Sequence, residues 1–184
     1  MKIYTGIGDK GRTVLFTGQS ISKNDNLLHA YGTLDELNSI LGIVIAITKN
    51  DEVKSLIYDL QNLIIMLSSD LATPYHNETK VKIHRFNENE INYIENTINA
   101  YENKLKPLKN FILPGGSLTS CYLHNARTVC RRAERYLADY IENKTINEYA
   151  YIFMNRLSDL FFSLSRYANQ CENIEDIIQK PIFK

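Results

Sequence analysis

The sequence predicts an all-α protein, built as a five-helix antiparallel bundle. Three observations support this fold class. Apolar residues recur at three- and four-residue intervals over long segments, the four prolines all lie outside those segments, and most glycines fall in loops. Helical segments of about 15 to 25 residues joined by short loops are typical of antiparallel bundles. We expect the bundle to form one domain over residues 1–184.

The first two helices are predicted from a capping pattern and a long apolar stripe. Thr33 and Glu36 have the spacing of a capping box, so the first helix is expected to begin at Thr33 and to continue through the apolar stripe over 34–44. The second helix is expected over 53–71, where apolar residues recur every three or four positions until the stop at Pro74.

The other three helices each begin near a polar residue suited to an N-cap. Asn87, with Glu90 three residues later, predicts a third helix that ends before Pro107. The fourth helix is expected over 117–142, and the fifth over 147–171.

Three segments fall outside the predicted helices. The N-terminal segment, 1–25, is interpreted as a loop, and residues 74–86 as a polar excursion with one short alternating piece at 81–84. Residues 172–184 are expected to form a tail.

Composition and charge exclude several classes of protein. Lysine plus arginine number 21, as do aspartate plus glutamate, and a formal charge of zero argues against a generic nucleic-acid binder. The longest apolar stretch, 40–47, is far shorter than the ~20 residues of a membrane helix, and the N-terminus has no apolar signal core. Three cysteines without a Cys-x-x-Cys pair and four scattered histidines match neither a disulfide framework nor a metal site. We therefore expect a soluble cytoplasmic protein with no membrane or nucleic-acid partner.

Arginines are concentrated in the predicted fourth helix. Half of the eight arginines in the chain fall within nine residues, beside a single acid: Arg127, Arg131, Arg132 and Arg135, with Glu134. Most of this group lies on the side of the helix opposite its apolar face. A solvated charged face is the ordinary interpretation, but clustered guanidinium groups with few acids favour binding of a phosphate-bearing ligand.

The predicted fifth helix repeats this arrangement. Asn155, Asp159 and Arg166 share the side opposite its apolar residues. Because both polar stripes turn away from the core of their own chain, we expect them to meet solvent, a ligand or another subunit.

Two glycine-containing loops are candidates for ligand contact. Residues 5–13 hold three glycines, two basic side chains and two threonines, a composition that can turn backbone N–H groups toward an anion. The segment matches neither a Walker A loop nor a dinucleotide fingerprint, so a flexible N-terminal turn is an equal alternative. Residues 111–117 are interpreted either as a hydrophobic plug at the end of the bundle or as an apolar wall facing a ligand.

Five blocks of sequence together resemble one family of enzymes. They are Thr-x-x-Gly-Asp-Lys-Gly at 5–11, Ala-Tyr-Gly-Thr-Leu-Asp-Glu-Leu-Asn at 30–38, Phe-Ile-Leu-Pro-Gly-Gly-Ser at 111–117, Ala-Arg-Thr-Val-Cys-Arg-Arg-Ala-Glu-Arg at 126–135, and Asn-Arg-Leu-Ser-Asp at 155–159. From residue 2 to about residue 169 the chain resembles the PduO-type ATP:cob(I)alamin adenosyltransferases, also called corrinoid adenosyltransferases. The resemblance implies a homotrimer of five-helix bundles with active sites at subunit interfaces. It also implies transfer of the 5′-deoxyadenosyl group of ATP to cob(I)alamin, with release of triphosphate.

The resemblance further implies roles for individual residues. Asp35 of one subunit would pair with Arg127 of its neighbour beside the site, and Phe111 would displace the lower axial ligand of cobalamin. Phe183 is a further candidate for contact with the corrin. ATP would be bound by residues of the N-terminal segment and of the fourth and fifth helices: Thr5, Gly6, Ile7, Gly8, Asp9, Lys10, Gly11, Thr13, Lys23, Arg131, Arg132, Glu134, Arg135 and Asn155.

The same resemblance implies the small molecules and partners. ATP and reduced cobalamin are the expected substrates, with Mg²⁺ held mainly by the ATP phosphates. Gly6 stands where the family commonly has lysine, which predicts a lower affinity for ATP. A reductase, an adenosylcobalamin-dependent enzyme and a location in a bacterial microcompartment stay open. The alternative function is a carrier or sensor that binds ATP or cobalamin without transferring a group.

Overall fold

Five long helices, one short helix and a small β-hairpin make up the part of the chain that the structure describes. The structure is a computed structural model that describes residues 4, 6–15, 17–74 and 82–183. The elements, in chain order, are β1 (Arg12–Val14), β2 (Ser20–Ser22), α1 (Asn26–Ile47), α2 (Asp51–Leu71), α3 (Glu88–Glu102), α4 (Leu118–Tyr136), α5 (Ala138–Glu142) and α6 (Glu148–Cys171).

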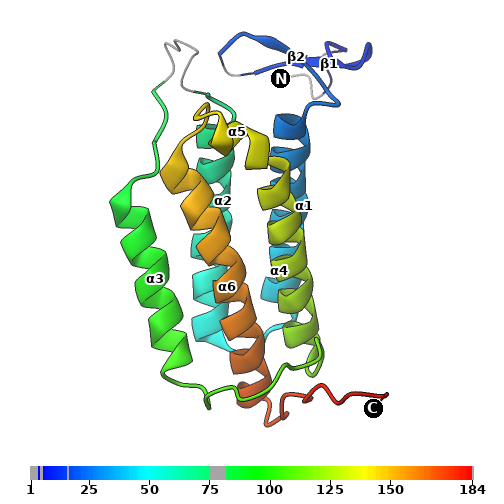
Figure 1. The fold of residues 1–184 in the computed structure, drawn as a ribbon, viewed down its shortest axis with the longest axis vertical. Coiled ribbons are helices and arrows are strands. Elements are labelled where there is room, and N and C mark those ends of the chain that lie inside the picture. Colours follow the sequence, from blue (N-terminus) through cyan, green and yellow to red (C-terminus); the bar gives the residue numbers. More distant parts are fainter. Residues whose placement is uncertain (1–3, 5, 16, 75–81, 184) are drawn as a thin grey trace.

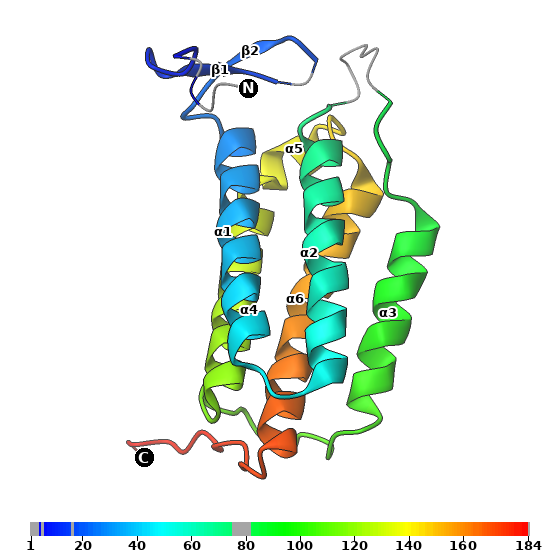
Figure 2. The ribbon, with the colours of Figure 1, turned by 180° about the vertical axis from the view of Figure 1, so that it is seen from behind.

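The long helices run alongside one another (Figure 1). Helix α4 packs most extensively against α6 and α1, while α2 lies beside α1 and also contacts α6. Helix α3 packs on the outer side of α6, and Figure 2 shows α1 and α2 in front of α4 and α6 when the molecule is seen from behind. The antiparallel hairpin β1–β2 lies beyond the N-terminal end of α1, and the C-terminus lies at the opposite end of the bundle.

The first helix begins earlier than the capping pattern predicted. Asp25 is its N-cap, and one oxygen of that carboxylate accepts a hydrogen bond from the Leu27 amide at 2.8 Å. Thr33 lies inside α1, where its hydroxyl donates to the His29 carbonyl at 2.7 Å, so the predicted start at Thr33 is wrong. Leu27 and Ala30 are both buried, and the core therefore extends the apolar stripe back beyond Thr33.

The predicted boundaries of the later helices are confirmed in part. Asn87 and Glu90 form the expected capping box at the start of α3, with the Asn87 amide donating to Glu90 Oε2 at 2.8 Å. The predicted fourth helix is interrupted at Leu137, a buried residue with (φ, ψ) of (−97°, 0°). A separate helix, α5, begins at the next residue. The described residues therefore form six helices and a hairpin, where the sequence predicted five helices and no strand.

Helix α1 is long and apolar enough to cross a membrane by the criteria of length and composition alone. Leu34, Leu37 and Leu41 on this helix are fully buried in the protein core, which accounts for much of its apolar character. Core helices of soluble proteins commonly pass the same test.

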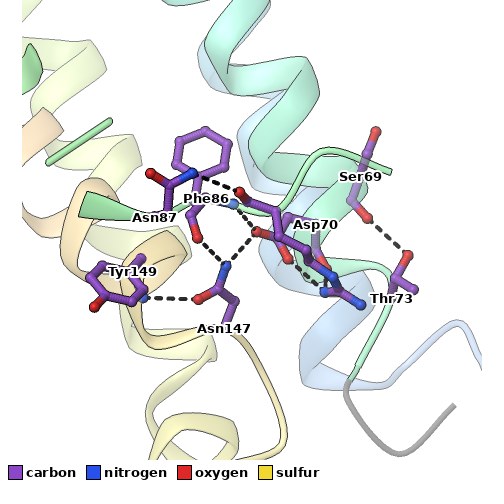
Figure 3. Close-up of polar contacts among 8 residues, drawn as sticks. Ser69, Asp70, Thr73, Phe86, Asn87, Asn147 and Tyr149 are labelled. Atoms are coloured by element: carbon purple, nitrogen blue, oxygen red, sulfur yellow. Dashed lines mark hydrogen bonds and ion pairs between the residues drawn. The ribbon is translucent and has the colours of Figure 1, made fainter. Parts of the chain in front are cut away.

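A buried carboxylate joins three segments at one end of the bundle (Figure 3). Asp70, in the last turn of α2, is 1% exposed and accepts hydrogen bonds from Arg85 Nη1 at 2.6 Å, the Phe86 amide at 2.8 Å and Asn147 Nδ2 at 2.7 Å. Asn147 also donates to the Phe86 carbonyl at 2.8 Å and caps α6 by accepting from the Tyr149 amide at 3.1 Å. We call these four residues, Asp70, Arg85, Phe86 and Asn147, the Asp70 latch. The sequence prediction of a polar excursion over 74–86 did not anticipate that its last residues are anchored in this way.

Candidate functional site

The N-terminal glycine loop folds back onto the hairpin. The Gly11 amide donates to the Gly8 carbonyl at 3.2 Å, and the Lys23 amide donates to the Gly11 carbonyl at 2.9 Å. The Lys23 side chain crosses directly over Gly8, because a Cβ atom added at Gly8 would lie 2.5 Å from Lys23 Nζ. The structure thus brings together the loop and the lysine that the family resemblance assigned to the same ligand.

Several other members of the loop lie at its surface. Ile7, Asp9 and Lys10 are exposed, whereas Thr13 is half-buried in β1. Thr5 lies outside the described residues. Gly6 has φ +72°, a conformation in which a side chain is strained, so this backbone suits the glycine found here better than a lysine.

Helices α3, α4 and α6 form a groove of about 340 Å³, and most of the residues that line it are polar or charged. Arg127 and Arg131 line it from α4, and Asp159 lines it from α6. The Arg127 Nε atom is buried and has no hydrogen-bond partner among the described residues. Burial lowers the pKa of Arg127, and the neighbouring Arg131 charge adds to this effect. Burial also raises the pKa of the Asp159 carboxyl, although Arg156 and Arg131 oppose the shift.

A chain of hydrogen bonds fixes Asn155 beside this groove. Asn155 Nδ2 donates to Glu134 Oε1 at 2.9 Å, and its amide oxygen accepts from Arg156 Nη1 at 2.9 Å. Arg156 Nε in turn donates to Glu95 Oε1 on α3 at 3.0 Å. Glu134 and Asn155, which the resemblance assigned to the same ligand from two different helices, are therefore in direct contact.

The four clustered arginines do not all lie on the same face of α4. Arg132 makes an ion pair with Glu36 on α1 and does not line the groove. Arg135 Nη1 donates to the Arg131 carbonyl at 3.2 Å, and both side chains are exposed. At 100° per residue, Arg132 likewise lies apart from Arg127, Arg131 and Arg135 on the helix.

Asp35 lies in a different groove, between α1, α2 and the hairpin. This groove of about 410 Å³ is mainly apolar, and Asp35 is exposed along it together with the half-buried Asn38. The Asn38 Oδ1 atom is buried without a hydrogen-bond partner among the described residues. Within one chain the structure therefore does not bring Asp35 and Arg127 into the same cavity.

Phe111 stands in the loop between α3 and α4, and 86% of it is exposed. The interpretation of this residue as part of a hydrophobic plug is therefore wrong for the isolated chain. Phe183, at the same end of the bundle, is 88% exposed. The segment preceding Phe183 is attached to the loop, because the Leu113 amide donates to the Ile177 carbonyl at 2.7 Å and the Gln179 amide donates to the Phe111 carbonyl at 2.8 Å.

Arg166 differs from its predicted position on an outward polar stripe. It is 5% exposed, and its Nε donates to Asp176 Oδ2 at 2.8 Å. Sequence reasoning missed this pairing because it treated 172–184, which contains Asp176, as a tail. A second acid, Glu102 on α3, lies 4.0 Å from Arg166 Nη1. Across the described ranges, no group of three or more His, Cys, Asp or Glu side chains is arranged to hold a metal ion.

Comparison with known proteins identifies relatives along almost the whole chain. A family model described as cobalamin adenosyltransferase matches residues 3–168. A corrinoid adenosyltransferase from Citrobacter freundii is 39% identical over 165 residues, which cover 90% of this chain and 93% of that relative. Another from Bacillus subtilis is 36% identical over 181 residues, which cover 96% of this chain and 91% of the relative.

A solved structure shares the same fold. It is a variant of a PduO-type ATP:corrinoid adenosyltransferase from Lactobacillus reuteri complexed with cobalamin and ATP. The two structures superpose with a TM-score of 0.90 at 36% sequence identity, and the match covers 97% of each chain. The family model spans most of the chain and the fold matches over nearly its whole length, and the chain therefore belongs to the cobalamin adenosyltransferase family.

Proposed function

We propose that the protein transfers the 5′-deoxyadenosyl group of ATP to cob(I)alamin, giving adenosylcobalamin and triphosphate. The observation that carries this proposal is the full-length similarity, in both sequence and fold, to an enzyme complexed with both substrates. A new Co–C5′ bond forms as the C5′–O bond of ATP breaks, and the electron pair of the broken bond leaves with the triphosphate. The reduced cobalt of the substrate supplies the nucleophile, so the protein needs none of its own.

The chain's own residues would position the substrates and balance the charge of the leaving group. The loop over 6–11, with Thr5, Thr13 and Lys23, would wrap the phosphates, and Lys23 is already held against Gly8. Arg131, Arg132 and Arg135, with Glu134 and Asn155, would contact ATP from the helices. Fixed cations near a leaving triphosphate stabilise the charge that develops on it. Mg²⁺ would enter with the phosphates, whose oxygen atoms it prefers as ligands.

We also propose that the active site forms between subunits of a homotrimer of helical bundles. Asp35 of one subunit would enter the groove that holds Arg127 in the next. Two observations support this: the buried Arg127 Nε has no partner in the described part of the chain, and Asp35 lines a separate, largely apolar groove. Such head-to-tail contacts use two different surfaces of each subunit, and they close into a ring when the rotation between neighbouring subunits closes.

A cytoplasmic location would suit this reaction. A reductase must supply Co(I), and an adenosylcobalamin-dependent enzyme would consume the product. Residues 172–184 are proposed to act with the single bundle domain rather than as an independent unit, since Asp176 pairs with Arg166.

The test is an anaerobic assay with ATP and chemically reduced cobalamin. We expect adenosylcobalamin and triphosphate to form in equal amounts. The alternative, a carrier or sensor, predicts that both ligands bind while no triphosphate appears.

Replacing Phe111 by alanine is expected to impair formation of four-coordinate Co(II) cobalamin much more than ATP binding. The exposed aromatic ring would otherwise occupy the space of the lower axial ligand. The spectrum of Co(II) cobalamin bound with ATP measures this directly. A spectrum unchanged from that of the wild-type protein would contradict the role of Phe111.

Replacing Gly8 by alanine is expected to raise KM for ATP by about five- to tenfold. The new methyl group would displace the Lys23 ammonium from its place over Gly8 and weaken the charge-assisted contact that it is proposed to make with a phosphate. Steady-state kinetics with varied ATP measures the effect. Gly42→Ala is the matched control, because a Cβ there meets only Gln61 Nε2 at 3.8 Å, an ordinary contact distance. Equal KM values for both variants would contradict the proposed place of Lys23 in the phosphate site.

A further inference from the structure

Two buried polar side chains near the end of α6 hold the loop that carries Phe111. Arg166 is 5% exposed and Asn169 is 3% exposed. Asn169 Oδ1 accepts a hydrogen bond from the Ser117 amide at 2.9 Å, and Asn169 Nδ2 donates to the Gly115 carbonyl at 3.1 Å. Arg166 Nη2 donates to the Lys106 carbonyl at 2.7 Å. Together the two side chains fix both ends of the segment 106–117.

Asp176 joins the same side chains to the C-terminal segment. One carboxylate oxygen accepts from Arg166 Nε at 2.8 Å, and the other accepts from Asn169 Nδ2 at 3.3 Å. The next residue, Ile177, accepts from the Leu113 amide at 2.7 Å. We call Arg166, Asn169 and Asp176 the α6 brace.

The second glycine of the loop, Gly116, is explained by this brace. Gly116 has φ +107°, and a Cβ atom there would lie 2.1 Å from Asn169 Oδ1. The loop therefore needs glycine both for its backbone conformation and for the close approach of the asparagine. The motif that the sequence showed as Pro-Gly-Gly-Ser is shaped to receive a side chain of α6.

Phe111 depends on the brace because little else holds it. With 86% of the residue exposed, it gains little from packing against its own chain. Its backbone is held by the Gln179 amide at 2.8 Å and by the antiparallel bridge between Ile112 and Ile178. Those tail residues follow Asp176 directly, so the brace and the tail together determine where the Phe111 ring stands.

We infer that Arg166, Asn169 and Asp176 are positioning residues that set the place of Phe111 on the corrin side of the site. This inference rests on the proposed function, since it concerns the step in which Phe111 excludes the lower axial ligand. The brace lies at the end of the bundle opposite the hairpin, so its loss should affect cobalamin and leave ATP binding intact.

Asp176→Asn and Asn169→Ala test this inference. Asp176→Asn keeps the shape of the side chain and removes its charge. We expect each variant to raise KM for cobalamin by about tenfold, the scale of one or two strong hydrogen bonds, while KM for ATP changes by less than about twofold. We also expect a weaker four-coordinate Co(II) signature.

The control is Asn147→Ala, which removes a buried asparagine of the Asp70 latch at the other end of α6. It should lower thermal stability without changing KM for cobalamin. The double variant Asp176→Asn/Phe111→Ala should have the same KM for cobalamin as Phe111→Ala alone. The effects of two residues do not add when one acts through the other.

Three outcomes overturn the inference: wild-type KM and Co(II) spectrum in both brace variants, the same loss in Asn147→Ala, or additive losses in the double variant. Failure of the proposed function is distinguishable, because then the wild-type protein itself forms no adenosylcobalamin.

Discussion

Replacing Arg127 by lysine is expected to lower kcat by at least about a hundredfold, because lysine keeps the charge but loses the planar, bidentate guanidinium. Asp35→Asn is expected to have an effect of similar size, because it removes the proposed carboxylate partner of Arg127. Both variants should stay folded, since within one chain neither side chain has a hydrogen bond or ion pair in the described contacts that the replacement would break. Steady-state kinetics and thermal unfolding measure the two effects. Wild-type kcat/KM in either variant would contradict the proposed site.

The control for Asp35→Asn is Asp59→Asn, which neutralises an exposed carboxylate on the neighbouring helix α2. A mixing experiment then tests whether the site is shared between subunits. In a ring of three, an Asp35→Asn subunit still offers Arg127, and an Arg127→Lys subunit still offers Asp35. Co-refolding the two inactive variants in equal amounts should restore about a quarter of wild-type turnover. About three quarters of the trimers are then mixed, and each mixed trimer has one intact interface out of three. No recovery in mixtures shown to contain mixed oligomers would contradict a shared site.

Replacing Asp70 by alanine is expected to lower the free energy of unfolding by about 3 kcal/mol, which corresponds to a Tm lower by about 6 to 12 °C for a chain of this size. The change leaves the Phe86 amide and the Asn147 side chain without their buried acceptor. Buried donors that lose their acceptor are the costly part of such a substitution. Thermal unfolding at a fixed protein concentration measures the shift.

Asp59→Ala is the matched control for this prediction. Asp59 lies on the same helix, is exposed, and should change stability by less than about 0.5 kcal/mol. If both variants unfold at the wild-type temperature, the Asp70 latch does not contribute to stability.

Helix positions could largely be predicted because their signals are local. The stripe over 53–71 and the Asn87 cap with Glu90 each lie within a few turns of the residues they organise. The start of α1 was missed although Asp25 and the buried Leu27 give the signal for it. The turn at Leu137 was not predicted, because the sequence around this buried leucine remains compatible with a continuing helix.

The candidate site, too, has local features that could be predicted and distant contacts that could not. The glycine loop and the arginine cluster were visible in the sequence because each is a short run of unusual composition. The contact of Lys23 with Gly8 was implied only by resemblance, since a folded hairpin is required to bring the two residues together. Arg166 was expected to meet solvent, a ligand or another subunit, because a helical wheel contains no information about partners from a distant segment of the same chain.

By itself, the sequence determined the helical class, most of the core, the family resemblance and the types of residue available for binding a triphosphate. These properties follow from periodicity and composition, which act over a few helical turns. Only the tertiary structure decided that Asp35 and Arg127 occupy separate grooves, that Asp70 joins three segments, and that the Phe111 loop is held from α6. Each of these depends on contacts between residues distant in the chain, and their geometry exists only once the helices have packed.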